Sequence, residues 1–507
     1  MGSYATQTGN FDYQLSFRQN TGVHNWVFSL TYDEVSTTLW ESPTEEQIIS
    51  GGTGISESVG YSNGTLFLGD PSGGRVEVYQ SEITTQGAFK GSFSKVNRVY
   101  PFGAGTASGF GSALQALEHS CIVGAPQATF GDNLEAGAIF YYNFTQTGLQ
   151  GATGTGAWGQ SFFVSGTEAS GAFGCAFSSR LSSLTPIVGV GASGELEGSG
   201  RSYVYNGLDG SKIFTISPTG VGVSHFGKSQ GACLADGLGC VAIGYEQGGL
   251  GKIDIYKEAT AGNNDYAFFQ TLEGADSSYG ATVQGRGSTL IIGAPDAGGE
   301  GAVYTYPFSA ESGTFYLSQT IQAENISAGD HFGKSFDFGD SVAVIGSDAN
   351  FGSAYIFEPS GSLWEEKSQF SGSASSIDGS FAGKSDGSKS LVSDGNRAIV
   401  GTYGENDAYI FTTGLDVGVD YSGVAFSGNG NKIYDSDGNF IYGYGAGDMC
   451  VISGGVFTGG YYSIFINENL CVSRSPREAG VGLTGSLNSW SATGFDQMTH
   501  YFLNIWN

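Results

Sequence analysis

Residues 222–229 (GVSHFGKS) match the phosphate-binding loop pattern letter for letter. In that chemistry the loop follows a strand and opens a helix, because backbone amides aligned at the helix N-terminus bind the phosphates. No helical period follows this segment, and Gly-Lys-Ser recurs at residues 333–335 and 383–385. We therefore predict that the three copies start equivalent repeat units and bind no nucleotide. His225 and His331 hold the same place in two copies, and we expect them to cap or stack on a turn rather than bind a metal.

Residues 434–439 (YDSDGN) contain two aspartates at the spacing of a calcium loop. They lack the third acid and the distal Glu that complete such a loop, so a plain hairpin turn is the favoured interpretation. The sequence has no nucleophile elbow and no zinc-binding helix pattern, and its five His are scattered. We predict no catalytic residues, no metal and no cofactor. Carboxylate pairs are plentiful, so glycoside hydrolysis by two carboxylates stays open as an alternative.

The composition indicates a folded and strongly acidic chain. Among 507 residues there are 85 Gly but only 10 Pro, while 35 Phe, 27 Tyr and 6 Trp supply ample core surface, which excludes collagen and simple disorder. The formal net charge of −28 argues against a nucleic-acid partner, because neutralising phosphates requires clustered Lys and Arg. Residues 1–30 show no secretory signal, and no apolar run reaches the length of a membrane helix, so we expect no membrane insertion.

Two cysteine pairs are candidates for disulfides. Cys233 and Cys240 could face each other across a hairpin, and Cys450 and Cys471 could do so near the C-terminus. Six cysteines in a chain of this length are not a disulfide scaffold, so reduced, buried thiols are the alternative.

A short apolar run that ends in Gly recurs seven times. The runs are residues 66–71 (LFLGDP), 121–126 (CIVGAP), 187–192 (IVGVGA), 241–244 (VAIG), 290–295 (LIIGAP), 342–346 (VAVIG) and 398–401 (AIVG), with the key glycines at 69, 124, 189, 244, 293, 346 and 401. Phe-Gly or Tyr-Gly precedes most runs, at Phe110, Phe173, Phe226, Tyr279 and Phe332, with Phe381 as a variant. A continuous apolar run is typical of a strand buried on both faces.

Each run is followed by a loop, an alternating strand such as residues 302–306 (AVYTY), and a more polar fourth strand such as residues 363–370. Alternation is typical of a strand covered on one face. Four strands in each of seven units, without a helical period, predict an all-β chain built around a seven-bladed β-propeller.

These motifs resemble the Phe-Gly/Gly-Ala-Pro (FG-GAP) repeat propellers found in the heads of integrin α-chains, over roughly residues 37–412. The resemblance implies that the loops after the second strands share one face with the blade-to-blade loops, and that this face recognises partners. The expected contact residues are Asp70, Asp132, Glu135, Glu195, Glu197, Tyr245, Glu246, Asp296, Glu300, Asp348, Tyr403 and Glu405. Alternatively, these acids only keep a Gly-rich surface soluble. The family's acidic calcium loops are absent here, so we expect no calcium dependence.

The seventh unit lacks a fourth strand, and an open ring would expose a sheet edge. Residues 38–50 (TLWESPTEEQIIS) match the fourth strand of unit six, residues 362–371 (SLWEEKSQFS), so we predict that residues 39–49 complete the last blade. We expect three domains. They are N-terminal strands in residues 1–36 that pack with the C-terminal domain, the propeller in residues 37–412, and a small β-sandwich in residues 413–507.

We expect a non-enzymatic protein of a virion surface, as a tail, fibre or capsid-exposed component that mediates host attachment. Its partners would be a host surface glycan or protein and, through the terminal domain, other virion structural proteins; a homo-oligomer is possible. The support is the acidic, Lys-poor, Gly/Ser/Thr/Tyr-rich composition, which resembles that of extracellular proteins. Two alternatives stay open, a cellular adhesin or matrix protein of a marine microbe and a carbohydrate-active enzyme on a propeller.

Overall fold

A computed structural model describes most of the chain. The described residues are 10–19, 22–31, 42–50, 55–62, 64–83, 89–103, 106–117, 120–146, 156–180, 187–207, 209–260, 265–339, 342–348, 352–372, 380–381, 390–393, 397–403, 407–413, 425–429, 448–458, 461–466 and 470–474. Contacts divide the chain into two compact units. One comprises Ser42–Glu82 and Phe89–Thr413, and the other comprises Met1–Glu41, Ile83–Ala88 and Gly414–Asn507.

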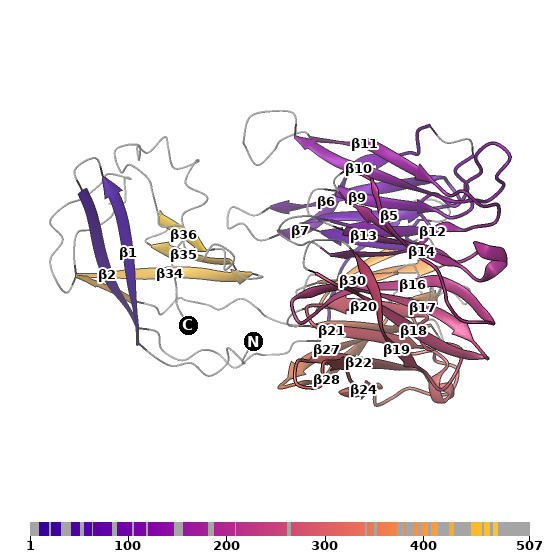
Figure 1. The fold of residues 1–507 in the computed structure, drawn as a ribbon. Helices are drawn as coiled ribbons and strands as arrows, with labels where there is room; N and C mark the ends of the chain where they lie inside the picture. Colours follow the sequence, from indigo (N-terminus) through magenta and orange to yellow (C-terminus); the bar gives the residue numbers. More distant parts are fainter. Residues whose placement is uncertain are drawn as a thin grey trace. The chain divides into compact units, whose positions relative to one another are not determined.

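The larger unit is a β-propeller of seven antiparallel sheets, counted over the described residues (Figure 1). Blade 1 contains β4 (Ser58–Ser62), β5 (Thr65–Asp70), β6 (Arg75–Ile83) and β7 (Phe89–Val99). Blade 2 contains β8 (Ala113–Ala116), β9 (Ser120–Ala125), β10 (Ala138–Gln146) and β11 (Gly156–Ser165). Blade 3 contains β12 (Phe173–Arg180), β13 (Ile187–Ala192), β14 (Arg201–Asn206) and β15 (Lys212–Ile216). Blade 4 contains β16 (Val223–Ala235), β17 (Leu238–Gln247), β18 (Leu250–Glu258) and β19 (Tyr266–Glu273).

Blade 5 contains β20 (Thr282–Arg286), β21 (Thr289–Ala294), β22 (Ala302–Ser309), β23 (Thr314–Phe315) and β24 (Gln319–Ile321), the last two sharing the outer position. Blade 6 contains β25 (Phe336–Phe338), β26 (Ala343–Ser347), β27 (Ser353–Ser360) and β28 (Leu363–Phe370). Blade 7 contains β29 (Ser380–Phe381), β30 (Leu391–Ser393), β31 (Arg397–Tyr403), β32 (Asp407–Thr412) and β3 (Glu45–Ser50). The predicted all-β, seven-bladed fold is confirmed.

Burial explains why these sequences form strands at these positions. Every residue of β9, β13 and β26 is buried, because a second strand lies inside its blade and is covered on both faces. Along the outer strand β28, more and less exposed residues alternate, because only one face of that strand is covered. The prediction that the third strands are covered on one face only was wrong, because four consecutive residues are buried in each of β14, β27 and β32. Each third strand lies between the second and the fourth strand, so only the fourth strand is an outer one.

The ring is closed by the N-terminal segment, as predicted. β3 pairs antiparallel with β32, with Ile48 opposite Tyr409 and Glu45 opposite Phe411. Ile49 is buried in a cluster that joins blade 7 to blade 1. The described part of this strand is shorter than the predicted residues 39–49, and residues 39–41 lie outside the described residues.

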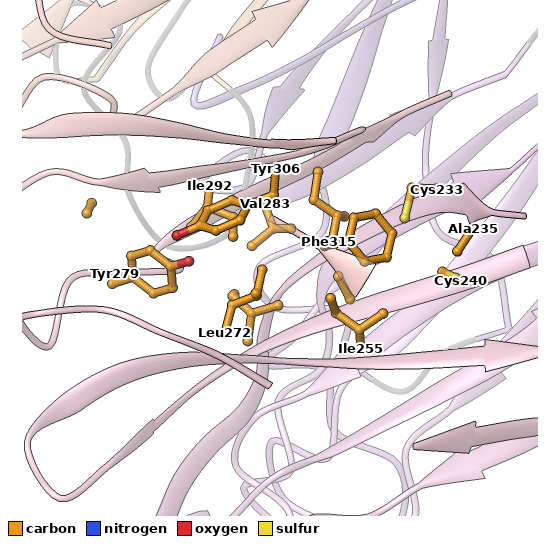
Figure 2. Close-up of a cluster of buried hydrophobic side chains, with 14 of the residues drawn as sticks. Cys233, Ala235, Cys240, Ile255, Leu272, Tyr279, Val283, Ile292, Tyr306 and Phe315 are labelled. Atoms are coloured by element: carbon orange, nitrogen blue, oxygen red, sulfur yellow. The ribbon is translucent and has the colours of Figure 1, made fainter. Parts of the chain in front are cut away.

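Aromatic side chains of the Phe-Gly motifs fill the blade interfaces. Phe110, Phe173, Phe226 and Phe332 are fully buried, each against strands of its own and the preceding blade. Tyr279 does the same between blades 4 and 5, where Figure 2 shows it in one cluster with Ile292 and Phe315.

The glycines of the second strands let neighbouring blades approach. A Cβ on Gly69 would lie less than 3.0 Å from the carbonyl oxygen of Gly111, the glycine of the next blade's Phe-Gly motif. Gly124 faces Gly174 in the same way, and Gly293 faces Gly333. In blade 3 the residue that faces Gly227 is Gly191, so the choice of Gly189 as the key glycine was wrong. The sequence IVGVGA offers two glycines, and only contact with the next blade distinguishes them.

The smaller unit contains one sheet of six strands within its described residues. Their order is β1 (Asn10–Gln19), β2 (Gly22–Thr31), β33 (Ala425–Asn429), β34 (Asp448–Thr458), β35 (Tyr461–Ile466) and β36 (Leu470–Arg474). β2 pairs with β33, with Phe28 opposite Gly428, so strands from both ends of the chain share this sheet. A second sheet, which a sandwich requires, is not among the described residues; the sandwich and the domain boundaries stay predictions.

Candidate functional site

The segment that matches a phosphate-binding loop lies mostly within a strand. Residues 223–229 belong to β16, and the next element is the strand β17 rather than a helix. Lys228 pairs with Glu246 of the same blade at 2.8 Å, and the Ser229 hydroxyl donates to the Gly280 carbonyl of the next blade. The second copy matches it, because Lys334 pairs with Asp348. These two copies lie at the starts of blades 4 and 6, as predicted. The third copy, residues 383–385, lies outside the described residues.

Three of the expected contact residues lie in the interior. Tyr245 is 5% exposed and its hydroxyl donates to Asp254 at 3.0 Å. Glu195 is 1% exposed, and Asp70 is buried in an ion pair with Arg75. Placing these side chains on the contact surface was wrong, because each one satisfies a buried polar partner of its own blade.

Three further expected residues are exposed or half-buried but are held by neighbours. Glu246 pairs with Lys228 as described. Asp348 accepts from Nδ1 of His331 at 2.6 Å, and Nε2 of His331 lies 3.6 Å from Asp296. His331 has a left-handed backbone (φ 52°) and bridges the loops of blades 5 and 6, which agrees with the turn role predicted for it.

Asp132, Glu135 and Glu197 are exposed, and their carboxylates make no hydrogen bond or ion pair within the described residues. They lie in loops of blades 2 and 3. Together with the connection between these blades, the loops form a surface that we name the acidic loop cluster: residues 126–137, 166–172 and 193–200. Glu300 is half-buried in the corresponding loop of blade 5. For Tyr403 only the backbone is described, and Glu405 and residues 434–439 lie outside the described residues.

Backbone hydrogen bonds hold the three loops of the cluster together. Ser170 N–H donates to the Leu134 carbonyl at 2.8 Å, and Gly194 N–H donates to the Gly171 carbonyl at 3.0 Å. Leu196 N–H donates to the Glu168 carboxylate at 2.8 Å. The loops after the second strands of blades 2 and 3 therefore contact the blade-to-blade loop, as the resemblance implied. The exposed acids lie on loops whose backbones are fixed by these hydrogen bonds.

The backbone of this cluster is unusually strained. Glu135, Ser170, Ala172, Leu196 and Glu197 all have φ between 50° and 57°. Residues other than glycine avoid this left-handed region, at a cost of about 1–3 kcal/mol each, unless the surroundings impose it. Backbone strain of this kind clusters at functional sites, so it indicates that these loops are a candidate functional site.

A partly buried polar network supports the acidic loop cluster. Arg201 pairs with Glu168 and lies 3.4 Å from Glu195, which also accepts from the Tyr203 hydroxyl. The hydrogen bond from Leu196 N–H, aided by Arg201, lowers the pKa of Glu168. Burial raises the pKa of Glu195. Arg201 and Glu168 were not among the residues predicted from the sequence. The available signal was Arg201, a base at the start of a third strand in a chain with few Lys and Arg.

Five basic side chains near this face of the propeller are neutralised within the described structure. They are Arg75 (with Asp70 and Glu77), Arg201 (Glu168 and Glu195), Lys228 (Glu246), Lys252 (Glu273) and Lys334 (Asp348). Asp132, Glu135 and Glu197 have no such counter-charge, so the acidic loop cluster carries surplus negative charge. A field of one sign steers partners of the opposite sign.

Other candidate chemistry is limited. No group of three or more His, Cys, Asp or Glu side chains gathers as a metal site requires in the part of the chain that the structure describes. Cys233 and Cys240 lie opposite each other across the β16–β17 hairpin as thiols, without a disulfide. The Cys450–Cys471 pair is untested, since its side chains are not described. No helix among the described residues is long and apolar enough to cross a membrane.

Comparisons with known proteins give similarity of structure alone. No protein-family model matches the chain, and no curated protein matches it in sequence. Among solved structures, the crystal structure of the Saccharomyces cerevisiae Sqt1 is 13% identical, with a TM-score of 0.41, over 80% of this chain and 97% of that one. A crystal structure of a mitotic checkpoint complex contains a chain that is also 13% identical, with a TM-score of 0.43, over 73% of this chain and 94% of that one.

Proposed function

We propose that this chain is a non-enzymatic recognition protein, a propeller of Phe-Gly/Gly-Ala-Pro repeats that binds a basic segment of a partner protein through the acidic loop cluster. The observation that carries the proposal is the unbalanced charge of Asp132, Glu135 and Glu197 on loops whose backbones are fixed. Rigid scaffolds carry recognition on such loops. Leu134, which is 64% exposed between two of these acids, supplies an apolar contact.

The partner's chemistry follows from this surface. The three unpaired carboxylates, with Leu134 exposed between Asp132 and Glu135, complement a Lys- or Arg-rich segment that also carries an apolar residue. Charge complementarity acts mostly on the association rate and falls with added salt. Binding should therefore weaken as ionic strength rises.

A charge-neutral triple variant tests the proposal. Asp132→Asn, Glu135→Gln and Glu197→Gln keep side-chain size, which matters at the strained positions 135 and 197, and remove three charges. On an array of Lys/Arg-rich peptides, the wild-type chain should bind a subset and the triple variant should lose at least about tenfold in affinity. The control is Asp236→Asn, Asp265→Asn and Glu311→Gln, exposed acids on the loops of the opposite face. Equal binding by both triple variants would contradict the proposal.

We place this recognition, as a further proposal, at a virion surface, where the propeller would contact a host protein or glycan and the six-stranded unit would bind other virion proteins. The acidic, Gly-rich and Lys-poor composition supports an extracellular setting. Copurification with intact particles at a fixed copy number tests the location; its absence from purified particles would contradict it.

A further inference from the structure

A second surface on the propeller, at the rim of blades 1 and 2, exposes several aromatic rings. Phe102 is 81% exposed, Tyr100 is 52% exposed and Phe163 is 37% exposed. Tyr100 and Phe102 are close in the chain, and Gly103, which follows Phe102, lies against the Phe163 ring. Large apolar side chains gathered at one exposed place indicate a binding surface more often than isolated ones do.

The backbone that carries Tyr100 and Phe102 and the ring of Phe163 are held in place. The side-chain amide of Gln160 accepts from Phe102 N–H and donates to the Phe102 carbonyl, both at 2.8 Å. The Tyr142 hydroxyl donates to the Tyr100 carbonyl at 2.6 Å. Phe163 stacks on Phe130 with ring centroids 5.8 Å apart and an interplanar angle of 12°. The surface is thus an ordered platform on which Phe102 and Tyr100 are largely exposed, while the Phe163 ring stacks on Phe130 and Phe140.

The saturated backbone argues against a peptide strand. A strand that adds to a protein needs free main-chain N–H and C=O groups. At Phe102 both groups are taken by Gln160. A pyranose ring needs no free main-chain groups. Its C–H groups carry partial positive charge and are attracted to the negative face of an aromatic ring.

Charge at one end of the platform specifies the ligand further. Arg98 donates to the Tyr100 hydroxyl at 3.3 Å. Arg98 and Lys95 are partly exposed and share the single buried carboxylate of Glu77, while Arg75 also has Asp70. Among the described residues, three bases here face two acids, so Lys95 and Arg98 together carry one positive charge that is not balanced. Beyond the other end, Asp132 and Glu135 lie in the loop that carries Phe130.

We propose that Tyr100, Phe102, Phe163 and Arg98 form a binding site for a glycan that carries a single anionic group, a carboxylate or a sulfate. The sugar ring stacks on Phe102, and its anionic group meets Arg98. Asp132, Glu135 and the net charge of −28 disfavour a polyanion. This site goes beyond the acidic loop cluster and does not depend on it.

The test is an array of oligosaccharides with one uronic acid, one sialic acid or one sulfate, their neutral counterparts, and heparin. The full chain should bind a singly charged glycan more tightly than its neutral counterpart and more tightly than heparin. Phe102→Ala should lower the affinity at least about tenfold. Arg98→Gln should remove the difference between charged and neutral glycans. The matched controls are Phe268→Ala and Tyr316→Ala, exposed aromatics elsewhere on the propeller, which should bind like the wild type.

Each alternative result overturns the proposal. Failure to bind any glycan excludes the site, as does binding that Phe102→Ala leaves unchanged. Preference for heparin would indicate a polyanion surface. Binding of Asp/Glu-rich peptides in place of glycans, lost in Phe102→Ala, would assign the platform to a protein partner.

Discussion

Ile48 of β3 lies directly opposite Tyr409 of β32, so a strand from the start of the chain forms the outer edge of the blade that the chain completes last. The same strand reaches the next blade, because the Gln47 side chain accepts from Phe93 N–H at 2.7 Å and donates to the Phe93 carbonyl at 3.0 Å. β3 therefore both covers an edge of blade 7 and ties blade 7 to blade 1.

Removing β3 should open the ring. Deletion of residues 1–50 leaves β32 as an unpaired edge and removes Ile49 from its core, so we expect aggregation and loss of the propeller's cooperative unfolding transition. Deletion of residues 1–41 removes β1 and β2 but keeps β3, and should preserve that transition. Size-exclusion chromatography and calorimetry compare the two. A monomeric 1–50 deletion with unchanged melting would refute closure by β3.

Close approach of the blades should make their glycines intolerant of a methyl group. In Gly69→Ala the new Cβ would clash with the Gly111 carbonyl oxygen. This is a backbone atom, so it cannot move away as a flexible side chain could. We expect a loss of about 3 kcal/mol in the free energy of unfolding, measured by denaturant titration. Gly159→Ala, where a Cβ would meet nothing within 4 Å, is the control and should change stability little. Similar values for both variants would show that the blades can separate at no cost.

The repeats made the fold predictable. Seven copies of one pattern predict seven similar sheets, and the missing fourth strand of the last copy predicts the closure by the N-terminus. Which glycine of a second strand faces the next blade depends on contacts between blades, which the sequence does not give. Gly189 and Gly191 are equally plausible in sequence, and only the position of Gly227 shows which one the interface requires.

The site was harder to predict, for a physical reason. Glu195 and Glu197 are two residues apart in one loop, yet Glu195 is buried with Tyr203 while Glu197 is exposed. Left-handed backbone at Leu196 and Glu197 turns the two carboxylates to different environments. Neither this geometry nor the ion pairs that neutralise Lys228 and Lys334 can be derived from residue type alone. The aromatic platform was missed because Tyr100 and Phe102 belong to no repeat motif.

A glutamine bridge between blades 4 and 5 should contribute measurably to stability. The Gln270 amide accepts from Phe315 N–H and donates to the Phe315 carbonyl, both at 2.9 Å. Phe315 is buried, so Gln270→Leu would leave two backbone groups without partners and should cost about 2 kcal/mol in a denaturant titration. Gln322→Leu removes one hydrogen bond from an exposed side chain and serves as the control. A Gln270→Leu chain as stable as the control would mean that water replaces the bridge.

The buried carboxylate of Glu77 should make blade 1 sensitive to acid. Burial by itself would raise its pKa, but hydrogen bonds from Lys95 and Arg75 and the charge of Arg98 hold the pKa below its ordinary value of 4.5. Because the folded state binds the proton less readily than the unfolded state, this contribution is complete above about pH 4.5 and is lost as the pH falls through the lowered pKa.

Glu77→Gln should therefore be less stable than the wild type by about 2 kcal/mol near neutral pH, because it removes charge-assisted hydrogen bonds while Lys95 and Arg98 can still be hydrated. The difference in free energy of unfolding between the two proteins should shrink below pH 4.5, since protonation neutralises Glu77 in the wild type as the substitution does in the variant. Taking this difference cancels the titration of the other carboxyl groups. A difference that stayed constant from pH 7 to the acid limit of folding would show that Glu77 stabilises the blade by its shape and not by its charge.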